Sequence, residues 1–377
     1  MIKSIALLFS FLLSSGIPFS NDTTKSLPTA DESKIQIALL LDTSNSMDGL
    51  IDQAKSQLWK MVNELATSKK NGKTPSLEIA LYEYGNSGLS ANQGYIRQIS
   101  SLSSDLDKIS EALFQLTTNG GDEYCGWGIQ VATDELQWTN KADDLKIIII
   151  AGNEPFNQGR VNYKTSCKAA IQKGIMINTI HCGDYDKGVR DFWKDGADLT
   201  DGKYLNINQD DKVVHVSTPF DDKIIKLNKD LNETYIGFGH EGKERVTMQS
   251  VQDDNAASYG AANAVTRASF KSKSSYKNTS WDLVDAVEED EEVLTTVKEE
   301  QLPENMKTMS TKERKAYVEA QAKKRKAIQT EIQSLEKEVK AFVAKKQKEN
   351  SSELTLDKVM IETIKVQANQ KNFKFEE

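Results

Sequence analysis

The sequence predicts an α/β fold with a doubly wound, mostly parallel sheet and a mainly helical C-terminal extension. Two observations predict the sheet. Residues 35–41 and 145–151 are continuous apolar runs that end in polar turns, which is typical of strands buried on both faces of a parallel sheet. Around these runs, segments with helical spacing of apolar residues alternate with further short apolar runs, and this alternation indicates repeated strand–helix–strand units.

The individual elements follow from the same periodicities. We expect strands at residues 35–41, 77–84, 95–99, 145–151, 175–181 and 203–207. We expect helices between them at residues 49–68, 105–116, 126–138, 163–173 and 189–197. Beyond residue 207 the spacing predicts helices at residues 221–234 and 317–348, and residues 281–287 form a short amphipathic segment.

The composition limits the classes of partner. The chain has 377 residues, which is enough for two domains, and a formal net charge of -8. An acidic chain lacks the basic surface that nucleic-acid binding needs, so we expect no nucleic-acid partner.

The N-terminus predicts export. Residues 1–20 combine the positive charge of Lys3, an apolar stretch at residues 5–13 and small residues before position 21, as a secretory signal peptide does. The alternative is a buried N-terminal helix. No later stretch is apolar and long enough to cross a membrane. We therefore expect a periplasmic or secreted mature protein with no transmembrane segment.

A cluster of oxygen-bearing side chains follows the first apolar run. Asp42, Ser44 and Ser46 provide one carboxylate and two hydroxyls just past the end of the expected 35–41 strand. In open α/β sheets, ligands bind at this edge. These hard oxygen ligands suit Mg²⁺, and also Mn²⁺ or Ca²⁺, better than zinc. The alternative is a polar turn in which a serine caps the next helix without any metal.

The D-x-S-x-S spacing of these residues resembles the metal-ion-dependent adhesion site (MIDAS) of the von Willebrand factor type A (vWA) domain, a Rossmann-like fold. The resemblance covers about residues 34–210. The whole chain resembles a group of exported bacterial vWA-domain proteins that have no assigned activity, through the segments SNSMDGLIDQAKSQLW, LYEYGNSGLS, AGNEPFNQG and TIHCGDY.

The resemblance implies an arrangement of the sheet. The 95–99 strand is expected to be antiparallel at one edge, and the strand order is expected to reverse between the 35–41 and 145–151 strands. The loops at residues 42–48, 119–125 and 152–158 would then meet at one end of the sheet.

Two of these loops depart from the vWA pattern. In the second loop the family supplies a threonine after two glycines, whereas this chain offers Asp122 or Glu123. Counting from the glycines favours Asp122, and counting back from the following helix favours Glu123. In the third loop the family usually has Thr-Asp-Gly, but Gly152 stands at the aspartate position, so Asn153 or Glu154 is the candidate there. An added carboxylate would tighten metal binding and weaken the pull of the ion on a partner's carboxylate.

The resemblance implies a binding module rather than an enzyme, and we assign no catalytic residue. A divalent cation, Mg²⁺ first, would be held by Asp42, Ser44 and Ser46, and a partner protein would offer an acidic residue to it. The alternative function is a structural or scaffold protein with a degenerate, metal-free site. A further alternative is a metal-dependent hydrolase with Asp42 as the nucleophile.

Four other residues carry competing interpretations. In an oxidising compartment Cys125, Cys167 and Cys182 allow one disulfide, for which Cys167–Cys182 is the favoured pair; the alternative is three small buried side chains. We expect His181 at the rim of the sheet with a local hydrogen bond, rather than in a catalytic cluster.

The C-terminal half divides into three parts. We expect an extension at residues 211–287 that packs on the vWA domain, an acidic linker at residues 288–303 and a charged helical tail at residues 304–377. The tail helix carries apolar residues at heptad spacing, and these are Ile328, Ile332, Leu335, Val339 and Phe342. The stripe predicts either a helix that folds back on the body or homo-oligomerisation through a coiled coil.

Overall fold

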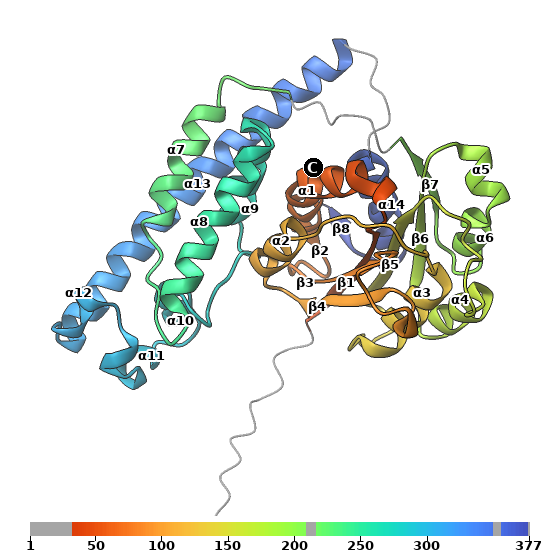
Figure 1. Ribbon diagram of the computed structural model, residues 1–377. Helices are drawn as coiled ribbons and strands as arrows, with labels where there is room; N and C mark the ends of the chain where they lie inside the picture. Colours follow the sequence, from red (N-terminus) through yellow and green to blue (C-terminus); the bar gives the residue numbers. More distant parts are fainter. Residues whose placement is uncertain (1–31, 209–215, 350–355, 376–377) are drawn as a thin grey trace, which may run out of the picture. The chain divides into compact units, whose positions relative to one another are not determined.

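One sheet of six strands lies at the centre of the computed structural model, which describes residues 32–208, 216–349 and 356–375. The strands run in the order β4-β3-β1-β5-β6-β7 (Figure 1). Their bounds are β1 Lys34–Asp42, β3 Ser76–Tyr84, β4 Ile96–Ser103, β5 Leu145–Gly152, β6 Met176–Cys182 and β7 Tyr204–Ile207. Only the β3–β4 pair of this sheet is antiparallel. The predicted fold class, the antiparallel edge strand and the reversal beside β1 are confirmed.

Strand β1 lies in the middle of the sheet, between β3 and β5. Every residue from Ile35 to Asp42 is buried. Because successive side chains of a strand point to opposite faces, Ile37 and Leu39 pack in one apolar layer and Leu40 packs in the other. Burial on both faces explains why the run is continuously apolar, and it fixes Asp42 at the C-terminal end of the central strand.

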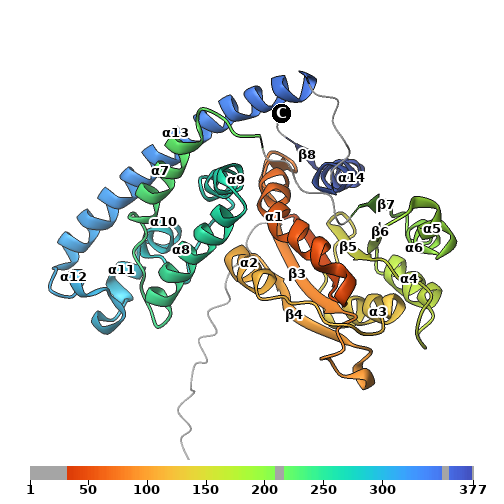
Figure 2. The ribbon, with the colours of Figure 1, turned by 45° about the horizontal axis from the view of Figure 1, so that its top comes forward.

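Helices cover both faces of this sheet (Figure 2). The face that includes Leu39 packs against α1 (Asp48–Leu65), α2 (Leu106–Phe114) and α14 (Leu356–Gln370). The opposite face packs against α3 (Cys125–Glu135), α4 (Tyr163–Gln172) and α6 (Trp193–Asp198). The single helix expected at residues 189–197 is instead split into α5 (Tyr185–Arg190) and α6, with Phe192 between them at a φ of 69°.

The cysteines lie on both sides of the sheet. Cys125 and Cys167 belong to the apolar layer under α3 and α4, whereas Cys182 belongs to the layer on the other face. All three are free and buried. The predicted Cys167–Cys182 disulfide is therefore wrong, because the sheet separates the two sulfur atoms.

A helical region follows β7. Its helices are α7 Asp221–Asn232, α8 Gly242–Ser258, α9 Ala261–Lys271, α10 Leu283–Glu289, α11 Val293–Thr296, α12 Glu304–Lys307 and α13 Thr311–Glu349. Phe270 of α9 packs on Trp59 of α1 with ring centroids 5.7 Å apart. Apolar side chains of α7, α9 and α13 share one core cluster with those of the sheet. Residues 33–377 accordingly form one compact unit.

A buried ionic network joins this helical region to α2. Arg267 of α9 is 1% exposed and donates to Asp107 of α2 at 2.8 Å and to Asp253 of α8 at 2.5 Å. Lys271, also buried, donates to Asp253 at 2.8 Å. The guanidinium of Arg267 also lies over the Trp59 ring, 4.3 Å from its centroid. Each charge is therefore paired, as buried charges must be.

The apolar stripe of α13 is used inside the chain. Ile328 and Ile332 are buried, and Leu335 and Val339 pack against the same core. The stripe is thus occupied by intramolecular contacts, which favours the helix that folds back. Homo-oligomerisation stays a prediction and would need another surface.

The segment at residues 288–303 differs from the solvated linker that we expected. It contains α11 and a short 3₁₀ helix at Glu299–Gln301. Leu294 and Leu302 are buried in a small cluster with Val318 of α13. The acidic residues lie on the exposed side of this packed segment. The division of the chain into domains at these boundaries stays a prediction.

The last described residues return to the sheet. Helix α14 places Ile364 and Ala368 in the core beside α1, and Gln367 exchanges hydrogen bonds of 2.9 Å and 2.8 Å with Asn178 of β6. A short strand, β8 (Lys374–Phe375), then pairs with β2 (Ser68–Lys69). Residues that the sequence assigned to a tail thus complete one layer of the α/β domain.

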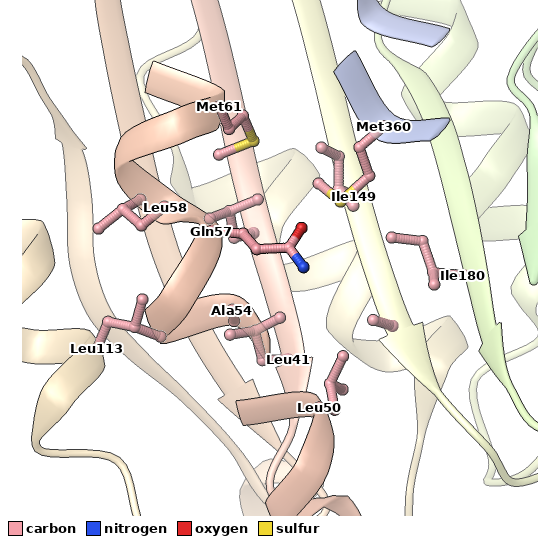
Figure 3. A pocket seen from close by; sticks show the side chains of 12 residues that line it. Leu41, Leu50, Ala54, Gln57, Leu58, Met61, Leu113, Ile149, Ile180 and Met360 are labelled. Carbon is pink, nitrogen blue, oxygen red and sulfur yellow. The ribbon is translucent and has the colours of Figure 1, made fainter. Parts of the chain in front are cut away.

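A cavity of about 50 Å³ lies between the sheet, α1 and α14. Figure 3 shows the Gln57 amide among aliphatic side chains in this cavity, including Leu50, Ile149 and Ile180. Gln57 is 5% exposed, and neither its amide nitrogen nor its amide oxygen has a hydrogen-bond partner within the described ranges. Burial of an unpaired amide is unfavourable.

We therefore expect Gln57→Leu to stabilise the protein by about 1–2 kcal/mol, because leucine has a similar volume and no polar atom to desolvate. Urea unfolding monitored by circular dichroism measures the change. Gln53→Leu is the matched control on the same helix, since Gln53 donates to the Asn208 carbonyl at 3.0 Å and should give no gain. A loss of stability in Gln57→Leu would contradict the interpretation.

Candidate metal site

The three polar loops meet at the C-terminal end of β1. The backbone N–H of Asn119 donates to the Thr43 carbonyl at 2.9 Å, which joins the second loop to the first. The Asn153 amide donates to the Ser46 hydroxyl at 3.1 Å, which joins the third loop to the first. These two bonds bring candidate ligands from distant parts of the sequence to one edge of the sheet.

Asp42 is the buried centre of this cluster. Its side chain is fully inaccessible to solvent, and Oδ1 accepts from the Ser44 N–H at 2.8 Å. Oδ2 makes no hydrogen bond to any residue that the structure describes. Burial raises the pKa of Asp42 to about 7, hydrogen bonds from Ser44 lower it, and the neighbouring Glu154 raises it further. A buried carboxylate oxygen without a partner is an acceptor that a cation would satisfy.

The two serines lie beside it. Their Oγ atoms are 3.4 Å apart, with Ser44 buried and Ser46 exposed. Ser44 precedes the 3₁₀ turn Asn45–Met47, but its side chain makes no capping hydrogen bond, and α1 starts after Met47 without a side-chain cap. The structure thus gives no support to helix capping as the role of Ser44.

The two acidic residues of the second loop differ in burial. Asp122 is exposed and accepts from the Tyr124 hydroxyl at 2.9 Å. Glu123 is buried, and Asp42 and Glu154 both act on its charge. Burial raises the pKa of Glu123 to about 7, Asp42 adds to the rise, and a hydrogen bond with the Ser44 side chain opposes it. Of the two alternatives, Glu123 is the one that lies at the cluster.

The two candidate residues of the third loop also differ in their contacts. Asn153 donates to Ser46, while its own Oδ1 is buried and has no hydrogen-bond partner. The Glu154 carboxylate accepts from the Gln158 amide at 3.2 Å. Asn153 therefore offers the available oxygen, and Glu154 contributes its charge from farther away.

Two glycines and a tyrosine shape the cluster. A Cβ at Gly152 would lie 3.0 Å from Asp42 Oδ2 and 2.5 Å from the Tyr84 hydroxyl, so the aspartate of the vWA pattern has no room there. The Tyr84 hydroxyl instead donates to the Ala151 carbonyl at 2.8 Å. A Cβ at Gly85 would lie 2.8 Å from Asp42 Oδ1, so this position also needs glycine. Neither Tyr84 nor Gly85 was predicted from the sequence; the available signal was their position at the end of β3, the strand beside β1.

The donor set fits a hard cation. Within residues 32–208, 216–349 and 356–375, no three His, Cys, Asp or Glu side chains are placed to hold a metal ion together. A cation here would therefore need hydroxyl and amide oxygens and water in addition to Asp42 and Glu123. Mg²⁺ is commonly held by one or two carboxylates together with several waters, and Ca²⁺ accepts amide oxygens as well.

His181 lies near the end of β6, so its predicted position at the rim of the sheet is confirmed. It is buried, and its ring centroid is 5.8 Å from that of Trp193. Burial, together with the charge of Lys187, lowers the pKa of His181, and a hydrogen bond with the Asn153 backbone opposes this fall. These contacts favour a packing role over a catalytic cluster.

Residues 36–196 match the family model of the von Willebrand factor type A domain. This part of the chain is therefore a vWA domain, with the fold that the sequence resemblance implied.

Several solved structures are similar to part of the chain. They include the SpRpn10 VWA domain (19% identity, TM-score 0.35, 47% of this chain and 90% of that chain). They also include BatB from Bacteroides thetaiotaomicron (16% identity, TM-score 0.36, 46% of this chain and 90% of that chain). A third is an aerotolerance-related membrane protein from Bacteroides fragilis NCTC 9343 (14% identity, TM-score 0.32, 46% of this chain and 92% of that chain). No curated protein sequence matches the chain.

Proposed function

We propose that this protein is an exported vWA-domain interaction module whose binding to a partner protein depends on a divalent cation at Asp42. The main support is the unpaired Oδ2 of Asp42, which is buried where three loops are joined. Mg²⁺ is the first candidate, with Mn²⁺ and Ca²⁺ as alternatives. The vWA domain itself is typically a protein-interaction module rather than an enzyme.

Residues of all three loops would contribute to cation binding. Asp42, Ser44 and Ser46 would hold the cation from the first loop. Glu123 and Asn153 would complete the set from the other loops, while Glu154, bound to Gln158, would add negative charge. A partner protein would offer an acidic residue to the bound cation.

Export depends on the expected signal peptide. Residues 1–20 lie outside the described residues, so this part of the proposal rests on the sequence alone. Over the ranges that the structure describes, none of the helices has the length and apolar character needed to cross a membrane. Cell fractionation and sequencing of the mature N-terminus test the proposal, with cleavage expected near residue 21.

Cation binding is the step that can be measured without a known partner. We expect calorimetric titration of residues 21–377 with Mg²⁺, Mn²⁺ or Ca²⁺ to give a single binding event. Asp42→Asn should abolish it, because the amide keeps the size of the side chain and removes the central charge. Asp122→Asn is the matched control, since Asp122 is exposed and bonded to Tyr124, and it should bind as the wild type does.

The alternative is a scaffold with a metal-free site. Gly152, which leaves the third loop without the aspartate of the vWA pattern, favours it. This alternative predicts no heat of binding for any of the three cations in the wild-type protein. Undiminished binding by folded Asp42→Asn would also remove Asp42 from the mechanism.

A further inference from the structure

We propose that Glu123 is an internal ligand of the cation site, so that the free protein carries its own substitute for a partner's carboxylate. The inference rests on the proposed cation site and adds how that site is regulated. An acidic partner would have to displace Glu123 before it could reach the cation.

Glu123 is buried, and in the part of the chain that the structure describes no positive charge acts on it. Glu123 is only 7% exposed. Such burial is rare for glutamate unless the carboxylate is paired with a positive charge or bound to a metal. The charges that act on it are those of Asp42 and Glu154, and both are negative. The negative charges of these carboxylates repel one another. A cation bound between them would replace this repulsion by attraction.

The backbone is shaped to let the two carboxylic side chains approach. A Cβ at Gly85 would lie 2.8 Å from Asp42 Oδ1 and 2.9 Å from Glu123 Cγ. Gly85 has a φ of +80°, which also favours glycine. Asp42 and Glu123 therefore lie on either side of a position that has no side chain.

A second observation points independently to a ligand at this place. Asp42 is completely buried and its Oδ2 has no partner, and the Asn153 Oδ1 is likewise buried and unpaired. These acceptors come from the first and third loops, and Glu123 adds the second loop. The cluster thus presents oxygen atoms from all three loops. Among the described residues, neither Asp42 Oδ2 nor Asn153 Oδ1 makes a hydrogen bond, although the Asn153 backbone N–H lies close enough to Asp42 to lower its pKa.

The charge balance explains the regulatory effect. Two carboxylates, Asp42 and Glu123, neutralise a divalent cation, so a third carboxylate from a partner gains little attraction. An exchange of Glu123 for the partner's carboxylate keeps the total charge constant. Binding of acidic partners would then be weak in the free protein and would strengthen when Glu123 moves away.

Luminescence of bound Tb³⁺ tests the proposal directly. Tb³⁺ is a hard cation, and its decay rates in H₂O and D₂O give the number of water molecules on the ion. We expect Glu123→Ala to gain about one or two such waters relative to wild type, depending on whether the carboxylate binds through one or both oxygens. Asp122→Ala, the adjacent exposed acid, should leave the number unchanged.

A second measurement uses a carboxylate probe. With Mg²⁺ present, glutarate should bind Glu123→Gln at least about tenfold more tightly than wild type, because the near-isosteric amide removes one of two neutralising charges. This variant also keeps the test available if Glu123→Ala does not fold.

The outcomes separate the two proposals. Failure of wild-type protein to bind Tb³⁺ or Mg²⁺ overturns the cation site itself. Binding of Tb³⁺ with the same number of waters in wild type and folded Glu123→Ala overturns the internal ligand only. Equal affinity of wild type and Glu123→Gln for glutarate overturns the regulatory role of Glu123.

Discussion

Replacement of Arg267 by methionine is expected to destabilise the protein by about 3–5 kcal/mol, the cost of removing one member of a buried ion pair. Methionine has no charge and no donor, so Asp107 and Asp253 would each lose a hydrogen bond to the guanidinium. Asp107 belongs to α2 and Arg267 to α9, so the loss falls where the helical region contacts the α/β layers. Urea unfolding at fixed pH measures the change in the free energy of unfolding.

A surface ion pair provides the control for Arg267→Met. Lys315 is half exposed and lies 3.3 Å from Glu291 and 4.0 Å from Glu319. Exposed pairs of this kind contribute less than about 1 kcal/mol. Lys315→Met should therefore have little effect, and a similarly small effect of Arg267→Met would show that the buried network does not stabilise the fold.

The stability of the metal-free protein is expected to fall as the pH rises from about 4 to about 7. The pKa of Asp42 is raised from 3.8 to about 7 in the folded state by burial. Folding therefore favours the protonated carboxyl, and this contribution is fully present below the unfolded pKa and is lost as pH rises through the folded pKa. The loss for Asp42 is on the order of 4 kcal/mol.

The measurement is thermal unfolding in EDTA between pH 4.5 and 8, with Asp42→Asn as the reference. The variant should show a flatter profile because it has no carboxyl at this position to ionise. Saturating Mg²⁺ should reverse the trend for wild type, since a cation binds the ionised carboxylate and stabilises the folded state. Parallel profiles for wild type and Asp42→Asn in EDTA would contradict the assignment.

The sequence was sufficient for the central sheet because the physical signal there is local. The runs of β1 and β5 are apolar at most positions, and such runs are typical of strands that are buried on both faces. The break between α5 and α6 was missed because the positive φ of Phe192 leaves no periodic signal. Helix α14 was missed as part of the sheet layer because its position depends on contacts with α1 and β6, far away in the sequence.

The candidate site also combines residues that the local sequence predicts with residues whose position depends on the folded loops. The spacing of Asp42, Ser44 and Ser46 follows directly from a strand end, so the sequence identified them. The choice between Asp122 and Glu123 depends on how the second loop bends around Gly85, which no periodicity encodes. In the same way, Asn153 is distinguished from Glu154 only by the hydrogen bonds that each side chain makes.

The packing of α14 on the central sheet has a consequence for biosynthesis. The ribosome produces residues 356–375 after the entire helical region, yet Ile364, Ala368 and Phe373 fill the same apolar layer as side chains of β1 and β6. A nascent or truncated polypeptide without these residues leaves part of that layer open to water. The complete apolar layer can thus form only after residues 356–375 have been synthesised, and a product that lacks them exposes an apolar surface that proteases can recognise.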